Sequence, residues 1–334
     1  MEYFIGADIG GTKCSVVLAG RTRGEKISII GKCKYKTEDY NSPYDNIGKI
    51  IESIDELIIK NDIKKADIKH MGISSGGPIN SETGVIMSPP NLIGWDNIEI
   101  VRILEQRTGI RAALQNDANA CALAEWSFGA ARGYKHVIFL TFGTGMGAGM
   151  ILNGKLYKGA NDFAGEIGHV RMAEHGPVGY GKSGSFEGFC SGGGVAQLGK
   201  MKVLEKLQMG EKISFCPGMT ELEGLNAKLI GDAAEAGDEL ASEIYRISGE
   251  YLGRGLALLV DLLNPEIIVI GSIFARSESL LRQVAFNVLN RECLRSSLNA
   301  CKIVTAGLGE QLGDYGALAV ALYGHERTGE INGS

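Results

Sequence analysis

The sequence predicts an α/β protein built from two duplicated α/β domains with a cleft between them. The chain has 334 residues, which is more than one hydrophobic core ordinarily supports. Short apolar runs typical of strands alternate with segments whose apolar residues recur at helical spacing. A strand, a loop rich in glycine and threonine, and a second strand occur twice, at residues 3–19 and 137–152. We place the first domain at residues 1–117, completed by a closing helix at about 313–325, and the second domain at 118–312.

The composition excludes several classes of protein. Hydrophobic residues make up 44% of the chain and charged residues 22%, as in soluble globular domains. The net charge of -5 gives no electrostatic reason to expect nucleic acid. The seven cysteines include no CxxC pair, so neither a disulfide framework nor a zinc ribbon is indicated. There is no secretion signal, and no apolar run reaches the roughly 18 residues of a membrane span. We therefore expect a cytoplasmic protein that binds no nucleic acid and no membrane.

The first hairpin has the composition of a phosphate-binding turn. Its predicted strands, residues 3–7 and 15–19, are joined by Asp8-Ile9-Gly10-Gly11-Thr12-Lys13. Glycines at a hairpin tip free backbone N–H groups for phosphate, and Thr12 adds a hydroxyl. Asp8 suits Mg²⁺, directly or through water, because this ion takes few carboxylates. A Gly-Gly hairpin more often only turns the chain, so this motif alone leaves both interpretations open.

The next segment predicts a strand at 27–35, a helix at 44–61, a strand at 68–74 and a helix at 101–108. The strand at 68–74 ends in Ser75-Gly76-Gly77-Pro78. Small residues there leave room for a ligand at the carboxyl end of a strand, where open α/β sheets bind. In the following loop, Asn91 either forms a turn or binds a sugar hydroxyl.

The stretch from Leu114 to Glu125, LQNDANACALAE, is the one around which the rest of the chain is organised. An apolar strand ends at Asn116 and Asp117, and an alanine-rich helix at 118–125 follows. Aspartate is a preferred helix N-cap. It is also the side chain of a general base held at the mouth of a cleft. Taken alone, this stretch favours the capping interpretation for Asp117.

The second half repeats the first hairpin. A predicted strand at 137–142 leads into Gly143-Thr144-Gly145, and apolar character resumes at 150–152. Two such hairpins favour two halves that grip a triphosphate from opposite sides.

A glycine-dense segment after this hairpin contains two carboxylates and a histidine, Glu166, Glu187 and His169. These side chains suit sugar hydroxyls, although a lone histidine more often makes a structural hydrogen bond. Helical patterning covers 222–263 and 280–289, strands are predicted at 267–270 and 302–305, and a helix at 317–323 precedes an end that looks frayed.

Six segments together resemble the ROK family of bacterial sugar kinases and sugar-responsive repressors. In order and spacing they are DIGGTK (8–13), PNLIGW (90–95), NDANA (116–120), TFGTGMGAG (141–149), GEIGH (165–169) and LNPEIIVIGS (263–272). The resemblance covers nearly the whole chain and implies an actin-like, ribonuclease-H-like fold. It also implies a glucokinase-like, ATP-dependent hexose kinase that uses ATP and Mg²⁺.

The resemblance gives the candidate residues their roles. Asp117 would be the base that takes the proton of a sugar hydroxyl as its oxygen attacks the γ-phosphate. The sugar contacts implied are Asn91, Asn116, Glu166, His169 and Glu187. The implied ATP-binding residues are Asp8, Gly10, Gly11, Thr12, Lys13, Thr144 and Gly145 around the phosphates, with Gly271, Leu312 and Gly313 facing adenosine.

One departure from the family concerns zinc. Many members follow the GH dipeptide with a CxCGxxGC cluster, whose cysteines bind structural zinc together with the histidine. Here the three cysteine positions hold Val178, Tyr180 and Ser185. A site with only His169 left is not a tetrahedral zinc site, so we predict no structural zinc.

The sequence also allows two alternative functions. A sugar-sensing regulator would carry a winged helix-turn-helix before DIGGT, and with the hairpin beginning by residue 3 we expect none. A catalytically weak or inactive sugar-binding protein is the second alternative, against which the presence of Asp117 argues. The expected substrate is a hexose or N-acetylhexosamine, and the expected assembly a homodimer or homotetramer.

Overall fold

The computed structural model describes residues 1–22, 27–143, 145–271 and 273–332. The chain divides into two compact units. The first unit contains Met1–Gly133, Gly149–Ala164 and Gly307–Ser334, and the second contains Tyr134–Ala148 and Gly165–Ala306. The units place residues 118–133 and 149–164 with the N-terminal segment, whereas we assigned both to the second domain from the sequence.

The first unit is built on a five-stranded sheet in the order β3-β2-β1-β4-β7. Its strands are β1 (Glu2–Ile9), β2 (Lys13–Arg21), β3 (Ser28–Lys36), β4 (Ile68–Ser75) and β7 (Ala112–Asn116). The first three strands pair antiparallel, while β1, β4 and β7 run parallel. A small hairpin, β5 (Ile79–Asn80) with β6 (Val85–Ile86), is inserted after β4.

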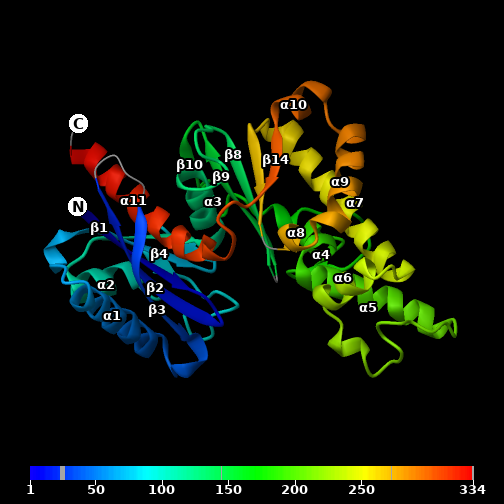
Figure 1. The fold of residues 1–334 in the computed structure, drawn as a ribbon, viewed down its shortest axis with the longest axis horizontal. Helices are drawn as coiled ribbons and strands as arrows, with labels where there is room; N and C mark the ends of the chain where they lie inside the picture. Colours follow the sequence, from blue (N-terminus) through cyan, green and yellow to red (C-terminus); the bar gives the residue numbers. More distant parts are fainter. Residues whose placement is uncertain (23–26, 144, 272, 333–334) are drawn as a thin grey trace. The chain divides into compact units, whose positions relative to one another are not determined.

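Helices cover both faces of this sheet (Figure 1). Alternate residues of β1, such as Ile5 and Ile9, pack with the apolar stripes of α1 (Pro43–Lys60) and α2 (Ile100–Thr108). On the other face, Phe4 packs with Leu318 and Leu322 of α11 (Leu312–Asn332). Helix α3 (Asp117–Ser127) follows β7 directly.

Two paired glycines let α11 lie directly on the sheet. Gly6 of β1 is in register with Gly72 of β4. A Cβ on Gly72 would lie 2.0 Å from the carbonyl oxygen of Ala317, and one on Gly6 would lie 3.0 Å from the Cβ of Ala317. No side chain fits between the helix and the sheet at this point, so these glycines fix how closely α11 approaches.

The second sheet repeats the topology of the first. Its order is β10-β9-β8-β13-β14, the same third-second-first-fourth-fifth arrangement. The strands are β8 (Val137–Phe142), β9 (Met146–Leu152), β10 (Lys155–Tyr157), β13 (Ile267–Ile270) and β14 (Lys302–Thr305). Strand β13 is fully buried and runs parallel to both β8 and β14. The predicted duplication is therefore present in the strand order of the two sheets.

Helices make up most of the second unit. They are α4 (Phe186–Cys190), α5 (Gly192–Gln208), α6 (Ala227–Glu235), α7 (Glu239–Leu263), α8 (Ile273–Arg276), α9 (Glu278–Glu292) and α10 (Arg295–Ala300). The glycine-rich segment before Gln208 was not predicted as helical, because glycine is a poor helix former. Ser191 nevertheless caps α5 by accepting a hydrogen bond from the Gly194 N–H.

The C-terminal helix is longer than predicted. Helix α11 begins at Leu312 and continues to Asn332, beyond the end at residue 323 expected from the sequence. Among the described residues, no helix combines the length and the apolar character needed to cross a membrane.

Candidate active site

Polar residues of the first unit line the carboxyl-terminal edge of its parallel strands. In the sheet register, Asp8 of β1 is opposite Ser74 of β4, and Ser75 is opposite Asn116 of β7. Ligands of open α/β sheets bind outside this edge. The Ser75 hydroxyl is buried and has no hydrogen-bond partner among the described residues. The edge therefore brings together a carboxylate, an unpaired hydroxyl and an amide.

Asp117 is not the cap of its helix. Asn116 is the N-cap, and its Oδ1 accepts a hydrogen bond of 2.7 Å from the Asn119 N–H. Asp117 is the first residue of α3, and its Oδ1 accepts from the Ala118 N–H at 2.8 Å. The capping interpretation is thus wrong for Asp117 and right for the residue before it, because either Asn or Asp can cap.

The environment of Asp117 makes its carboxylate a better proton acceptor. The residue is exposed, but the protein packed around the carboxyl group partly excludes water and raises its pKa above the usual value. Hydrogen bonds from backbone N–H groups partly oppose this rise in pKa. A carboxylate that is accessible and more basic than usual has the properties of a general base.

Asp8 lies in a concentration of negative charge. Burial raises its pKa to about 6, and the charges of Asp117 and Asp314 add to that rise. A hydrogen bond with Ser74 and the charge of Lys13 act in the opposite direction. A cation placed beside Asp8 would relieve this repulsion, which fits the single-carboxylate Mg²⁺ contact expected from the sequence.

Asp314, in the first turn of α11, was not singled out from the sequence. Its Oδ1 accepts a 2.8 Å hydrogen bond from the Ser15 hydroxyl, and its Oδ2 pairs with Lys32. These contacts attach the start of α11 to β2 and β3. They also seat Gly313 against Asp8, since a Cβ on Gly313 would lie 2.8 Å from the Asp8 Oδ2. The predicted adenosine residue Gly313 therefore lies beside the predicted magnesium ligand.

The tip of the first hairpin is exposed, and hydrogen bonds from Thr37 hold its backbone. The Gly10 N–H donates to the Lys13 carbonyl oxygen at 3.1 Å, which closes the turn. The Thr37 hydroxyl donates to the Gly10 carbonyl at 2.6 Å, and the Thr37 N–H donates to the Thr12 carbonyl at 3.0 Å. A Cβ on Gly11 would lie 2.3 Å from the carbonyl oxygen of Asn91. The turn is held in one shape and lies against the loop that carries Asn91.

The turn of the second glycine hairpin lies in the second unit. Thr144 lies outside the described residues. The Gly143 N–H donates to the Gly145 carbonyl oxygen at 2.9 Å. The Met146 N–H donates to Oε2 of Glu187 at 2.9 Å. Glu187, expected only as a sugar contact, is thus bonded to the backbone of the candidate phosphate turn.

Glu166 is the N-cap and His169 the last residue of a short 3-10 helix, Ile167–His169, and both are exposed. Gly165, before Glu166, and Gly168, between Glu166 and His169, both pack on β9. A Cβ on Gly165 would lie 2.0 Å from the Ala148 carbonyl oxygen, and one on Gly168 would lie 2.4 Å from that of Met146. The structure brings Glu166, His169, Glu187 and Gly145 into one unit. It places Gly271 in the same unit, buried against Phe139 at the end of β13.

The segment in which the family resemblance raised the question of zinc carries other side chains in this chain. Val178 lies in β11 (Val178–Gly179), which pairs with β12 (Lys182–Ser183). Tyr180, in the turn between them, contacts the His169 ring edge-on at 6.2 Å. Ser185 caps α4 through the Gly188 N–H at 3.1 Å. No cluster of three or more His, Cys, Asp or Glu side chains suitable for a metal occurs in the described residues. The three side chains do not fit zinc, and its absence stays a prediction.

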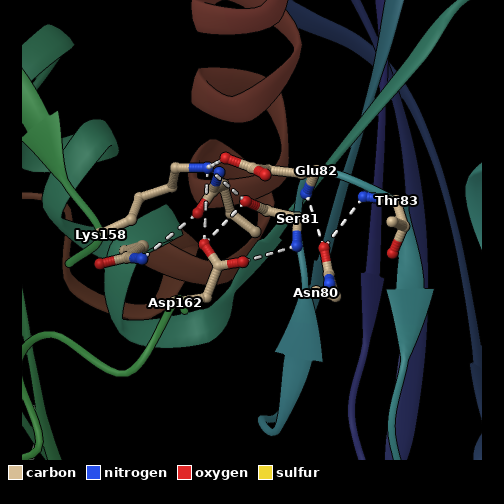
Figure 2. A network of polar contacts seen from close by, with 8 residues as sticks. Asn80, Ser81, Glu82, Thr83, Lys158 and Asp162 are labelled. Carbon is tan, nitrogen blue, oxygen red and sulfur yellow. Dashed lines mark hydrogen bonds and ion pairs between the residues drawn. The ribbon is translucent and has the colours of Figure 1, made fainter. Parts of the chain in front are cut away.

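A polar clamp fixes the β5–β6 hairpin of the first unit. Figure 2 shows Lys158 and Asp162, both after β10, reaching Ser81 in the hairpin. Asp162 accepts from the Ser81 N–H and from the Ser81 hydroxyl, each at 2.7 Å. Lys158 Nζ donates to the same hydroxyl oxygen at 2.7 Å and lies 3.6 Å from Asp162. Because the hairpin lies between β4 and Asn91, the clamp holds the segment that carries Asn91. No sequence signal marked these residues.

The family model described as the ROK family matches residues 4–323. The chain belongs to the ROK family. It is 32% identical over 321 residues to a glucokinase of Thermotoga maritima, an alignment that covers 95% of this chain and 96% of that protein. The ROK family and the fold class are therefore confirmed as predicted.

Two further relatives of this ROK protein show the range of the family. A ROK family glucokinase from Streptomyces griseus, solved in complex with glucose and AMPPNP, has a TM-score of 0.73 at 27% identity, covering 96% of this chain and 99% of that one. The DNA-binding transcriptional repressor Mlc of Escherichia coli is 28% identical over 249 residues, covering 74% of this chain and 59% of the repressor.

Proposed function

We propose that this ROK protein is an ATP-dependent hexose kinase in which Asp117 is the general base. The observation that carries the proposal is the state of Asp117, which is accessible, is relieved of capping by Asn116 and has a raised pKa. The similarity to the Thermotoga glucokinase over 95% of the chain supports the same activity.

The reaction follows from what each residue can do. Asp117 accepts the proton of a sugar hydroxyl as that oxygen forms a bond to the γ-phosphorus and the bond to the β-phosphate oxygen breaks, releasing ADP. The backbone N–H groups of Gly11 and Thr12, at the tip of the first hairpin, bind phosphate oxygens, while the Gly10 N–H closes the turn. Asp8 would hold the Mg²⁺ that arrives with ATP, and that ion would neutralise charge on the phosphates.

The sugar contacts are part of the same proposal. Asn91 is exposed beside the phosphate turn, and the remaining amide group of Asn116 is left for a hydroxyl after its oxygen caps α3. Glu166, His169 and Glu187 supply acceptors and a donor from the second unit. Relatives named glucokinase and a relative solved with glucose favour glucose as the first substrate to test. N-acetylhexosamines remain in the proposed substrate class, and a homodimer or homotetramer remains the expected assembly.

The test is an ADP-release assay with ATP, Mg²⁺ and a panel of hexoses and N-acetylhexosamines. We expect one sugar to give turnover that depends on Asp117. Failure of every sugar to release ADP, with intact protein, would contradict the proposal.

A sugar-responsive binding protein without kinase activity is the second candidate. It is favoured by the similarity to the Mlc repressor, although the chain spans 59% of that protein's length. This candidate predicts that calorimetry detects sugar binding while no ADP is released. The two candidates therefore differ in one measurement on the same sample.

A further inference from the structure

Glu187 connects the candidate sugar site of the second unit to its candidate phosphate turn. Its Oε2 accepts the Met146 N–H at 2.9 Å, at the point where the turn becomes β9. A Cβ on Gly145 would lie 3.0 Å from the same oxygen, so the carboxylate packs against the turn as well as bonding to it. Within the described part of the chain, Oε1 makes no hydrogen bond and is left for another donor.

The other end of the turn is bonded to the same corner of the fold. The Gly192 N–H donates to the Gly143 carbonyl oxygen at 3.0 Å. Gly192 is the first residue of α5 and lies just after α4, which carries Glu187. Gly143 and Met146, on either side of the candidate phosphate turn, are thus both bonded to the junction of α4 and α5.

The junction itself is firmly built. Ser185 and Ser191 cap α4 and α5, and the Ser191 N–H donates to the Glu187 carbonyl oxygen at 2.9 Å. Phe186 is fully buried and occupies the space of a missing side chain at Gly255, where a Cβ would lie 2.0 Å from the ring. Phe189 stacks on Tyr251 with ring centroids 3.5 Å apart. A side chain projected from this junction has little freedom to move, so Glu187 can fix the position of Met146.

We propose that Glu187 is a positioning residue for the nucleotide: its Oε2 holds Met146 and the Gly192 N–H holds Gly143, which fixes the backbone on both sides of the candidate phosphate turn, while Oε1 binds the sugar. This inference rests on the proposed kinase function. A glycine turn is flexible, and fixing its backbone before binding lowers the entropic cost of capturing phosphate. Because one carboxylate serves both ligands, sugar binding and nucleotide binding are coupled, and the coupling acts equally in both directions.

The experiment measures binding of the non-hydrolysable analogue AMPPNP with Mg²⁺ by calorimetry, in the absence of sugar. Glu187→Ala removes the acceptor and should weaken the affinity roughly tenfold, the range of a hydrogen bond to a charged group. Glu187→Gln keeps an oxygen acceptor at the same place and should restore most of that affinity. A residue that only contacted sugar would leave nucleotide affinity unchanged in both variants.

A second pair of variants tests the turn without changing any proposed sugar contact. Proline is tolerated at the first position of a helix, and Ser191 already has the extended backbone that precedes proline. Gly192→Pro therefore removes the N–H that bonds Gly143 and should weaken AMPPNP binding several-fold. Gly192→Ala keeps that N–H and reports the effect of the added side chain alone.

Glu266→Ala is the matched control for stability. Glu266 also accepts backbone N–H groups, from Lys135 at 2.6 Å and His136 at 2.8 Å, at the other end of β8. Its loss should lower the melting temperature without changing AMPPNP affinity. The inference is overturned if Glu187→Ala or Gly192→Pro is folded and binds AMPPNP like the unmodified protein. If the unmodified protein itself binds no AMPPNP, it is the proposed kinase function that fails.

Discussion

The sequence left Asp117 with two alternative interpretations, helix cap and general base; Asn116 is the cap, and Asp117 is the proposed base. Asp117→Asn should keep the fold and the sugar affinity and reduce kcat by at least about a hundredfold, because the amide cannot accept a proton. The measurement is ADP release at saturating sugar. A kcat near that of the unmodified enzyme would assign the base to another residue, with Glu166 or Glu187 next to test.

Comparing the stabilities of two alanine variants, Asn116→Ala and Asp117→Ala, distinguishes the helix cap from the proposed base. Asn116→Ala removes the acceptor for the Asn119 N–H and should lower the free energy of unfolding by about 1 kcal/mol. Asp117→Ala should cost less, because the cap remains in place. Urea denaturation of the two variants checks this order, and equal losses would mean that Asp117 also supports the helix end.

Asp8 should give the protein a characteristic dependence on pH. Its pKa is raised from 3.8 to about 6, so in the absence of Mg²⁺ the folded state binds the proton more tightly than the unfolded state. Stability therefore decreases as pH rises from about 4 to 6 on account of this group. Asp8→Asn removes that penalty, and its melting temperature should exceed that of the unmodified protein at pH 7 but approach it near pH 4.

The ionisation of Asp8 should also determine how activity depends on pH. Only ionised Asp8 can serve as a metal ligand, so kcat/KM should fall as the pH drops below about 6 in the unmodified enzyme. A profile that stays flat down to pH 5 would argue against a role for Asp8 in catalysis.

At the scale of elements, the clamp between the β5–β6 hairpin and the 158–162 segment should matter for sugar binding. The Asp162 side chain is only 6% exposed, and removing it leaves the Ser81 N–H and the Ser81 hydroxyl proton without their acceptor. Asp162→Ala should cost roughly 2 kcal/mol of stability. It should also raise the KM for sugar more than the KM for ATP, because the segment leading to Asn91 loses its anchor.

Two control variants isolate the carboxylate. Asp162 has a φ of 64°, which glycine adopts without strain, so Asp162→Gly removes the carboxylate without adding backbone strain. Glu82, the outer partner of Lys158 at 4.0 Å, is 84% exposed, and Glu82→Gln should change little. If Asp162→Gly changes the KM for sugar and the KM for ATP equally, the clamp supports the structure only and has no specific role in sugar binding.

The 170–190 segment should function without zinc. Its shape depends on the Ser185 cap, on Phe186 against Gly255 and on the stack of Phe189 with Tyr251. Elemental analysis of the purified protein should find no stoichiometric zinc. Treatment with a chelator, followed by excess Mg²⁺, should restore full activity. About one zinc per chain, retained after mild chelation, would overturn this prediction.

At the scale of the whole molecule, the sequence predicted the duplicated α/β fold because each half repeats one strand-glycine-strand pattern. It predicted the positions of the strands that are buried, such as Ile267–Ile270, because their apolar runs are continuous. It did not predict α5, whose first turn consists of glycines that capping by Ser191 makes tolerable. The low helix propensity of glycine argues against a helix at this position, but the surrounding structure stabilises one.

The sequence suggested residues for the candidate site, which stay a prediction, but not the contacts that hold them. Asp8 and Asp117 carry sequence signals because their neighbours form recognisable motifs. Asp314, Ser81 and Asp162 carry none, since each acts through a partner far away in the chain, such as Ser15 for Asp314. The same holds for the bond between Glu187 and Met146, which joins residues 41 positions apart.

The seating of α11 on Gly6 and Gly72 has a consequence for biosynthesis. The first unit needs this helix to cover Phe4 and Val17, yet the helix is made some 300 residues after them. During translation the N-terminal sheet therefore emerges with one apolar face uncovered, and it must wait, or be shielded by a chaperone, until α11 leaves the ribosome. The second unit, whose segments are complete by Ala306, is free to form its core earlier. The order of maturation would then run opposite to the order of synthesis.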